Sequence, residues 1–310
     1  ANMTGFGYNV SGFGSFPSRG GGGLYAFTAA TFTPGGKTGS SGPSLAQARS
    51  GLTGTDVSTW KNDTQYFNTS SGIMVWTVPA DGVYSIDCYG AGGAFCTRQS
   101  ANGGTGARIK GNFTLTSGQL INLVVGQAGR SQTNGWGGGG GGGGTFAWNP
   151  LSPSNPLIAA GGGGGGGRSS IGQQNAYTGT SGGQGSNGGS VGGTNGNPGA
   201  GNSCGGGGGQ GWNGGVSRHC GGNFTWPTLR SNPTGFSSGG HSTNMGGFGG
   251  GAGSYGGSGG AGGYSGGGSG GWSYAGFGGG GGSYNGGTSQ TAQTNQTPSA
   301  TAGKIIITRI

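Results

Sequence analysis

Short apolar runs of strand length, several with alternating polar residues, mark the first part of this chain. These runs lie at 73–78, 83–89, 108–115 and 120–125. In the second run, alternation places Tyr84, Ile86 and Cys88 on one face, as expected for a half-buried strand. Asp81-Gly82 marks a turn before the run at 83–89, and the turn composition of 116–119 predicts that 108–115 and 120–125 form a hairpin.

Weaker signals extend this β region in both directions. A short strand is expected around 25–32, and 44–49 has the pattern of one helical turn. The last run, at 304–310, is again apolar and strand-forming. Since antiparallel sheets accept a distant closing strand, residues 24–125 together with 304–310 are predicted to form one β-sandwich.

Residues 126–303 combine polyglycine runs with aromatic residues. The longest runs are 137–144, 161–167, 205–209 and 278–282. In flexible linkers, glycine is accompanied by serine and little else. These runs instead alternate with large aromatic side chains that favour burial. In the polyproline II conformation, backbone N–H and C=O groups point outwards and can bond to neighbouring segments. We therefore predict a bundle of polyglycine II helices inserted in the sandwich.

Composition favours an ordered chain. Glycine contributes 93 of the 310 residues, without the strict every-third-residue period of collagen. The 7 Trp, 10 Tyr and 13 Phe, with only 5% charged residues, are unlike the composition of disordered chains. The expected fold class is all-β.

Residues 1–23 are expected to form an extended arm. Apolar residues alternate there with glycine and asparagine, so one face of the arm would be apolar. The arm either packs as a strand on its own domain or inserts into a neighbouring subunit as an added strand. Candidate arm contacts are Phe6, Tyr8, Val10, Phe13 and Phe16.

The net charge of +9 arises from 13 Lys and Arg against 4 Asp, with no Glu. Such a surface attracts polyanions or serves solubility. The basic residues are scattered and Arg19 begins the only Arg-Gly-Gly, so a dedicated nucleic-acid binder is disfavoured. No apolar run reaches the roughly 18 to 20 residues of a membrane helix, so direct membrane insertion is not expected.

Four cysteines form two local pairs, Cys88 with Cys96 and Cys204 with Cys220. Neither spacing is Cys-x-x-Cys and the nearby histidine is His219, so a structural zinc site is poorly supported. We expect a disulfide within each pair, which would restrain loops and imply an oxidising, extracellular compartment. Buried thiols are the alternative.

Asn-x-Ser/Thr sequons permit N-glycosylation at several positions, although a chain this rich in Asn, Ser and Thr contains about five by chance. They lie at Asn2, Asn9, Asn62, Asn68, Asn112, Asn223 and Asn295.

Enzymatic chemistry is not expected. The titratable inventory is four Asp and two His, His219 and His241, which solvated loops explain better than a catalytic cluster. The Gly-x-Gly-x-x-Gly matches are compositional, because none lies between a strand and a helix. No catalytic, metal-binding or cofactor-binding residue is predicted, and no cofactor.

Aromatic residues among the glycines either hold the bundle together or contact a partner, as aromatics do on sugar rings and at protein interfaces. The surface around 224–236 is expected to be the most exposed. The candidate contacts are Trp136, Trp148, Trp212, Phe224, Trp226, Trp272 and Tyr274.

A set of motifs extends through the second half of the sandwich and the glycine-rich part: Val-Trp-Thr-Val-Pro-Ala-Asp-Gly-Val-Tyr-Ser-Ile at 75–86 and the segments 90–93, 157–167, 276–278 and 283–287. These motifs resemble the extracellular glycine-rich domain of the anaplastic lymphoma kinase and leukocyte tyrosine kinase receptors. The similarity covers roughly residues 72 to 310. It implies a jelly-roll sandwich like that of tumour necrosis factor, interrupted by polyglycine helices. Those receptor domains bind protein ligands, but receptor signalling does not carry over, since this sequence has no kinase or transmembrane segment.

Residues 24–27, 42–49 and 66–68 are similar to modules in phage and virus structural proteins, including tail-fibre-like proteins of aquatic phages. We therefore expect an extracellular structural or adhesive protein, a viral appendage component that contacts a host surface. Its expected partners are other appendage subunits and a cell-surface glycan or protein. The alternative is a self-assembling subunit of a cell-made extracellular filament, joined through the arm. An RNA-binding role is disfavoured by sparse Arg-Gly pairs and by the cysteine pairs.

Overall fold

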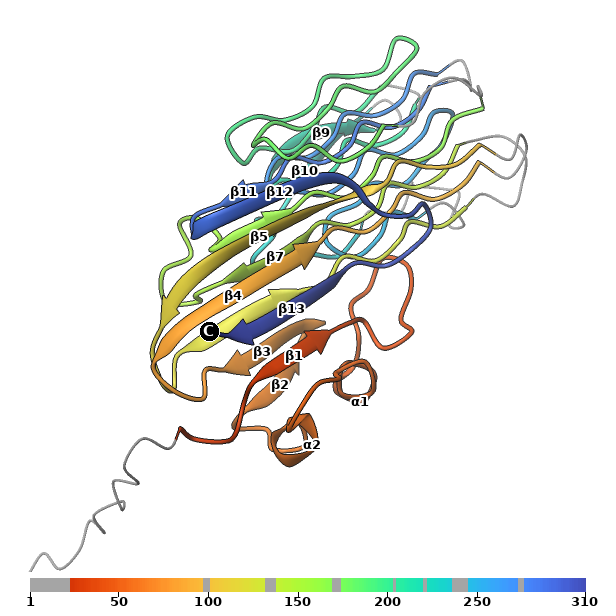
Figure 1. The fold of residues 1–310 in the computed structure, drawn as a ribbon. Helices are drawn as coiled ribbons and strands as arrows, with labels where there is room; N and C mark the ends of the chain where they lie inside the picture. Colours follow the sequence, from red (N-terminus) through yellow and green to blue (C-terminus); the bar gives the residue numbers. More distant parts are fainter. Residues whose placement is uncertain are drawn as a thin grey trace, which may run out of the picture.

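The computed structural model describes residues 23–96, 101–131, 138–168, 174–202, 205–219, 222–235, 245–272 and 276–310. Within these ranges the regular structure consists of three antiparallel sheets and two short helices (Figure 1). The expected all-β class is confirmed. The predicted arm, apart from Gly23, lies outside the described residues.

The first sheet has five strands and includes the end of the chain. In order across the sheet they are β1 (Ala29–Phe32), β13 (Lys304–Arg309), β4 (Gly82–Tyr89), β5 (Gly106–Leu115) and β12 (Thr288–Thr297). β13 pairs with β4 from Lys304 opposite Tyr89 to Arg309 opposite Tyr84. The last apolar run therefore lies inside the sheet, as predicted.

The second sheet has six strands and the third is a hairpin. The second consists of β11 (Tyr284–Asn285), β8 (Ile158–Ala160), β7 (Thr145–Trp148), β6 (Leu120–Val124), β3 (Ile73–Thr77) and β2 (Phe67–Ser70). β9 (Gly215–His219) pairs with β10 (Gly222–Trp226). Strands β7, β8, β11 and β12 come from 126–303, so the two large sheets extend beyond the residues predicted for the sandwich. The predicted hairpin of 108–115 with 120–125 is wrong, because the turn at 116–119 carries the chain from one sheet to the other: β5 pairs with β4 and β12, and β6 pairs with β3 and β7.

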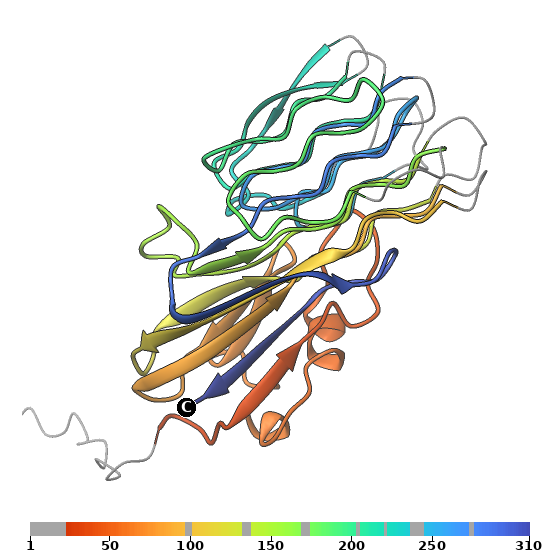
Figure 2. The same ribbon diagram turned by 45° about the horizontal axis from the view of Figure 1, so that its top comes forward.

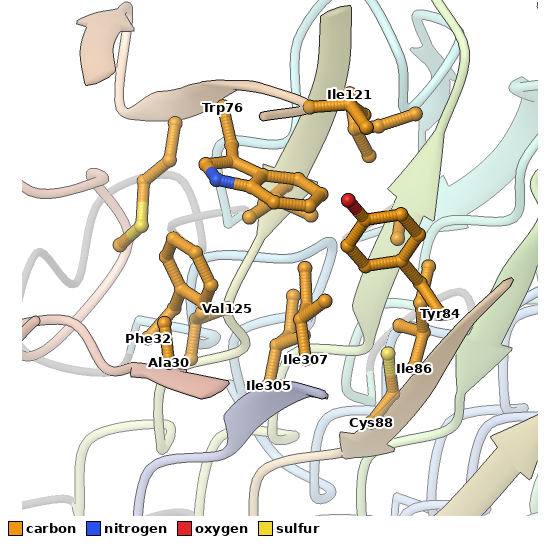
Figure 3. Packing of buried hydrophobic residues seen from close by; sticks show 14 of the residues in the cluster. Ala30, Phe32, Trp76, Tyr84, Ile86, Cys88, Ile121, Val125, Ile305 and Ile307 are labelled. Carbon is orange, nitrogen blue, oxygen red and sulfur yellow. The ribbon is translucent and has the colours of Figure 1, made fainter. Parts of the chain in front are cut away.

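The two large sheets enclose the main core. Tyr84, Ile86 and Cys88 are fully buried on one face of β4, as the alternation predicted. They face Trp76 and Ile121 of the second sheet (Figure 3). The core is rich in aromatic rings, with Trp76 and Tyr84 packed edge to face at 5.8 Å between ring centroids.

Two short helices lie beside β1 and β2. α1 (Leu45–Ser50) begins at Ser44, whose hydroxyl accepts a hydrogen bond from the Gln47 N–H, while the Gln47 side chain accepts one from the Ser44 N–H. This capping box confirms the predicted helical turn. α2 (Val57–Trp60) contributes Val57 and Trp60 to the core.

The described chain starts and ends at one end of the sandwich. The Leu24 N–H donates to the Pro79 carbonyl (2.6 Å), and the Ile310 N–H donates to the Val83 carbonyl (2.9 Å). Pro79 lies in the turn that joins β3 to β4, and Val83 lies at the start of β4.

Candidate functional site: a glycine-rich layer on the second sheet

Extended glycine-rich segments from several parts of the chain run side by side beyond the strands of the sandwich (Figure 2). They include 90–96, 125–131, 138–144, 161–168, 257–263 and 276–283. We call these and the segments packed among them the glycine-rich layer. Its backbone groups are satisfied mainly by other backbone groups, as buried peptide groups require.

The N–H groups of 138–144 donate in three directions, and every third residue donates to the same neighbouring segment. The bonds run from Gly139 and Gly142 to Gly166 and Gly163, from Gly140 and Gly143 to Arg130 and Gln127, and from Gly141 and Gly144 to Ala252 and Gly249. Their donor–acceptor distances lie between 2.8 and 3.1 Å. A strand would alternate between two directions, so this bonding pattern is different from that of a β-sheet.

The carbonyl groups of the same segment follow the same period. They accept from Gly259 and Gly262, from Ala94 and Ala91, and from Gly247. Segment 138–144 is therefore bonded to neighbours on all sides.

A second segment repeats the pattern at 259–264. Its N–H groups donate from Gly259 and Gly262 to Gly139 and Gly142, from Gly260 and Gly263 to Gly207 and Gln210, and from Ala261 and Tyr264 to Gly279 and Gly282. The period of three is thus a property of the layer rather than of one run.

Close approach of backbones explains the glycine content. A Cβ atom added at Gly141 would lie 2.1 Å from the Gly260 carbonyl oxygen, and one at Gly164 would lie 1.8 Å from that of Gly278. Real Cβ atoms essentially never come within 3.0 Å of such atoms. Runs of this length therefore satisfy a packing requirement and are not spacers.

Buried serines add hydrogen bonds within the layer. The Ser258 hydroxyl donates to the Gly166 carbonyl (2.7 Å). The Ser283 hydroxyl donates to the Tyr177 carbonyl (2.6 Å) and accepts from the Gly161 N–H (3.0 Å). Both serines are fully buried, so these bonds satisfy groups that water does not reach.

An aromatic cluster fixes the layer to the outer face of the second sheet. Trp148 and Phe146 of β7 contact Trp212 from the layer, at centroid distances of 5.6 and 6.0 Å. Phe248 and Leu229 also belong to this buried cluster. The Trp212 indole N–H donates to the Ser154 carbonyl (3.1 Å), so even its polar atom is satisfied internally.

Three of the predicted partner contacts are corrected by this packing. Trp148, Trp212 and Trp226 are 1%, 0% and 3% exposed and are not available to an outside partner. The Trp226 indole donates to the Gly208 carbonyl (3.0 Å). These residues hold the layer together, which was the alternative interpretation. Phe224 is half-buried and Trp272 is 50% exposed, whereas Trp136 and Tyr274 lie outside the described residues.

The predicted disulfide between Cys88 and Cys96 is wrong. Cys88 is a buried thiol in the main core, and Cys96 lies in a separate cluster with Ala101 and Phe277. The segment between them is extended, and about eight residues at ~3.1 Å each separate their backbones by far more than the roughly 7 Å a disulfide spans. Burial raises the pKa of the Cys88 thiol. Cys204 and Cys220 lie outside the described residues.

The sequons differ in exposure. Asn62, Asn68, Asn223 and Asn295 are exposed, whereas Asn112 is half-buried in β5 between two paired strands. Asn2 and Asn9 lie outside the described residues.

Among the described residues, no group of three or more His, Cys, Asp or Glu side chains is placed to hold a metal ion. A surface recess of about 280 Å³ over β2 and β3 is lined by uncharged side chains, including Asn68, Thr77 and Leu120.

Throughout the residues that the structure describes, no helix has the length and apolar character to cross a membrane. His219 is in β9, and His241 lies outside the described residues.

A charged cluster that was not predicted from the sequence lies on the outer face of the first sheet. The Arg108 guanidinium donates to both Asp87 carboxylate oxygens, with Nη2–Oδ2 at 2.8 Å. Hydrogen bonding to Asp87 raises the pKa of Arg108. Burial and the charge of Asp87 raise the pKa of Tyr89 beside it. In the sequence, Asp87 and Tyr89 alternate with the apolar positions Ile86 and Cys88 of β4, and this pattern was a signal that could have located the cluster.

No family model matches the chain.

Proposed function

We propose that this chain is a structural and adhesive module of an extracellular appendage, built as a jelly-roll sandwich that carries a polyglycine II bundle. The observation that supports this is the threefold period of backbone hydrogen bonding in the glycine-rich layer. A polyproline II helix has three residues per turn, so its N–H groups point in three directions about its axis. At ~3.1 Å per residue, segment 138–144 spans about 22 Å.

Such a bundle is a stiff support of small cross-section. Its segments are cross-linked by hydrogen bonds in every direction and anchored by Trp212 and Phe248 to the second sheet. A rigid scaffold that presents loops at its end is a common arrangement for recognition, because the ordering cost is already met before binding. This mechanical character suits a fibre or an adhesin better than a catalyst.

Exposed aromatics at one end of the layer are the best candidate contacts. Cys96 and Phe277 pack together, so the ends of 90–96 and 276–283 meet there. Phe95 and Trp272 adjoin these ends and are 40% and 50% exposed. We assign contact with a cell-surface glycan or protein to this end, with Phe95 as a candidate that the sequence analysis did not name.

Hydrogen exchange followed by mass spectrometry tests the architecture. Amides of 138–144 and 161–168 are expected to exchange as slowly as those of β4 and β5. Exchange at the rate of an unstructured peptide would show that these runs are flexible linkers, which would contradict the proposal.

Adsorption of labelled protein to candidate host cells tests the adhesive role. Replacing Phe95 and Trp272 by serine is expected to reduce adsorption with the melting temperature unchanged. Unchanged adsorption by this double variant would exclude this end of the layer as the contact surface.

A filament subunit is the second candidate function, because apolar residues are also exposed at the end of the molecule opposite to Phe95 and Trp272. Leu24, Val83 and Ile310 are 48%, 40% and 70% exposed, at the end where residues 1–22 join the described chain. The apolar face predicted for the arm would cover such residues on a neighbouring copy.

A further inference from the structure

The outer face of the first sheet carries cations from β13 and β5, the two strands that flank β4. Lys304 of β13 lies opposite Tyr89 of β4, which lies opposite Arg108 of β5. In the next row, Asp87 lies between Ile306 and Lys110. Figure 1 shows this sheet in front of the rest of the sandwich, whereas the outer face of the second sheet is covered by the glycine-rich layer.

Tyr89 and Asp87 hold the cluster in place. The Lys304 ammonium lies 4.6 Å from the centroid of the Tyr89 ring, and the Arg108 guanidinium carbon lies 5.4 Å from it. Arg108 also donates to Gln293 of β12 (3.0 Å). The Lys304 ammonium and the Arg108 guanidinium are therefore ordered before any ligand arrives, which lowers the entropic cost of binding.

The charges on this face do not cancel. Asp87 is the carboxylate of the cluster, and its side chain, about 10% exposed, is engaged by Arg108. Neither Lys110 nor Lys304 forms an ion pair with it within 4.0 Å. Two lysine charges are left to attract an anion, among the neutral side chains of Ser85, Asn112 and Gln293.

We propose that this face binds an acidic polysaccharide, with Lys110 and Lys304 each contacting an anionic group of the polymer. By standard strand spacings, the two Cα atoms are about 12 Å apart, two strands across and two residues along. A single small anion would have to draw both flexible side chains together, whereas the repeated carboxylates of a polymer can contact the two amines separately. The neighbouring amide side chains of Asn112 and Gln293 can hydrogen-bond to sugar hydroxyls.

Other occupants fit this face less well. A second copy docked face to face would place Lys110 and Lys304 near identical cations, which like-charge repulsion opposes. Nucleic acid is usually bound by a larger basic surface than two uncompensated lysines. The biological meaning of the site rests on the proposed adhesive function, but the binding can be measured without it.

Binding to immobilised alginate, a polymer of uronic acids, tests the proposal, with uncharged dextran as the reference polymer. The full chain is expected to bind alginate and not dextran, more weakly at 150 than at 50 mM NaCl. K110Q/K304Q is expected to lower the affinity about tenfold. K110R/K304R, which keeps both charges, is expected to retain most of it.

The matched control is K37Q/K61Q, which removes the same charge from residues beside the helices, away from this face. It is expected to bind nearly as well as the wild type. Equal losses in the two glutamine variants would show a net-charge effect and overturn the site. Tighter binding to single-stranded DNA or to phosphatidylserine vesicles than to alginate, at equal anion concentration, would overturn the polysaccharide assignment.

Cell adsorption separates this proposal from the adhesive function. If the wild-type protein adsorbs to cells but does not bind alginate, the proposed site on the first sheet is wrong while the adhesive function stands. Alginate binding that depends on Lys110 and Lys304, with no adsorption to cells, would support the site and contradict the adhesive role.

Discussion

Gly141 lies where a side chain has no room, because an added Cβ would come 2.1 Å from a backbone oxygen of the next segment. Gly179 differs, since it is exposed and an added Cβ would meet nothing within 4 Å. The amino-acid composition does not distinguish these two glycines. Their difference depends entirely on which segments the fold brings together.

Gly141→Ala is therefore expected to destabilise the protein by about 1 to 3 kcal/mol, the usual range for overpacking. Gly179→Ala is the matched control, and it is expected to be neutral or to stabilise slightly because it lowers the entropy of the unfolded chain. Calorimetric melting compares the two. Equal melting temperatures for both variants would contradict the close packing.

Cys88 is expected to resist alkylation in the folded protein. Burial raises its pKa above the ordinary 9.0, so the reactive thiolate is scarce at pH 8. In denaturant without reductant, iodoacetamide should label Cys88, since it is not bonded to Cys96. An unlabelled Cys88 peptide under those conditions would show that Cys88 forms a disulfide in the protein.

The same shift predicts a pH dependence of stability. The unfolded thiol ionises near pH 9, whereas the folded thiol stays protonated to higher pH. The contribution of Cys88 is therefore complete below about pH 9 and declines as the pH rises further. Denaturant unfolding of the wild type and Cys88→Ala between pH 7 and 10.5 measures it, with a steeper decline expected for the wild type.

At the scale of elements, the glycine-rich layer depends on a few large side chains. Segments without side chains bury no apolar surface of their own, so their attachment to the second sheet comes from Trp212, Phe248 and Leu229. The aromatics interspersed with glycine predicted burial in the sequence. The pairing of Trp212 with Trp148 and Phe146 could not be predicted, because it joins positions far apart in the chain.

Trp212→Ala is expected to cost about 3 to 5 kcal/mol, as for other fully buried large aromatics. Hydrogen exchange should increase in 205–211 and 257–263 before it increases in β4. The matched control is Trp272→Ala at an exposed position, with an expected change within about 0.5 kcal/mol. Similar effects of both substitutions would contradict the anchoring role of Trp212.

At the scale of the whole molecule, the first described residues and the last strand meet at the end of the sandwich where Leu24 and Ile310 are exposed. The exposed aromatics Phe95 and Trp272 belong to the glycine-rich layer instead. This polarity accommodates both proposed functions, since attachment and recognition would use different parts of the molecule.

Deleting residues 1–16 separates the two functions. If the arm joins neighbouring copies, the deletion should abolish fibres in electron micrographs while the melting temperature stays unchanged. Fibres that form normally without these residues would exclude arm-mediated assembly. Loss of cell adsorption in a monomeric deletion variant would instead place the host contact in the arm.

The sequence by itself determined the β class and the positions of the main strands, because side-chain alternation directly reflects the two faces of a strand. It also determined that the glycine runs pack, since aromatic residues recur between them and need burial. The closing strand at 304–310 followed from the same local signal.

Only the tertiary structure decided how the glycine segments are arranged. Glycine residues are chemically identical, so no local signal specifies that Gly139 donates to Gly166 rather than to another carbonyl. The same limit applies to Cys88 and Cys96, whose spacing suggested a bond that an extended segment prevents. It applies also to Lys110 and Lys304, which strand pairing alone brings to one face of the sheet.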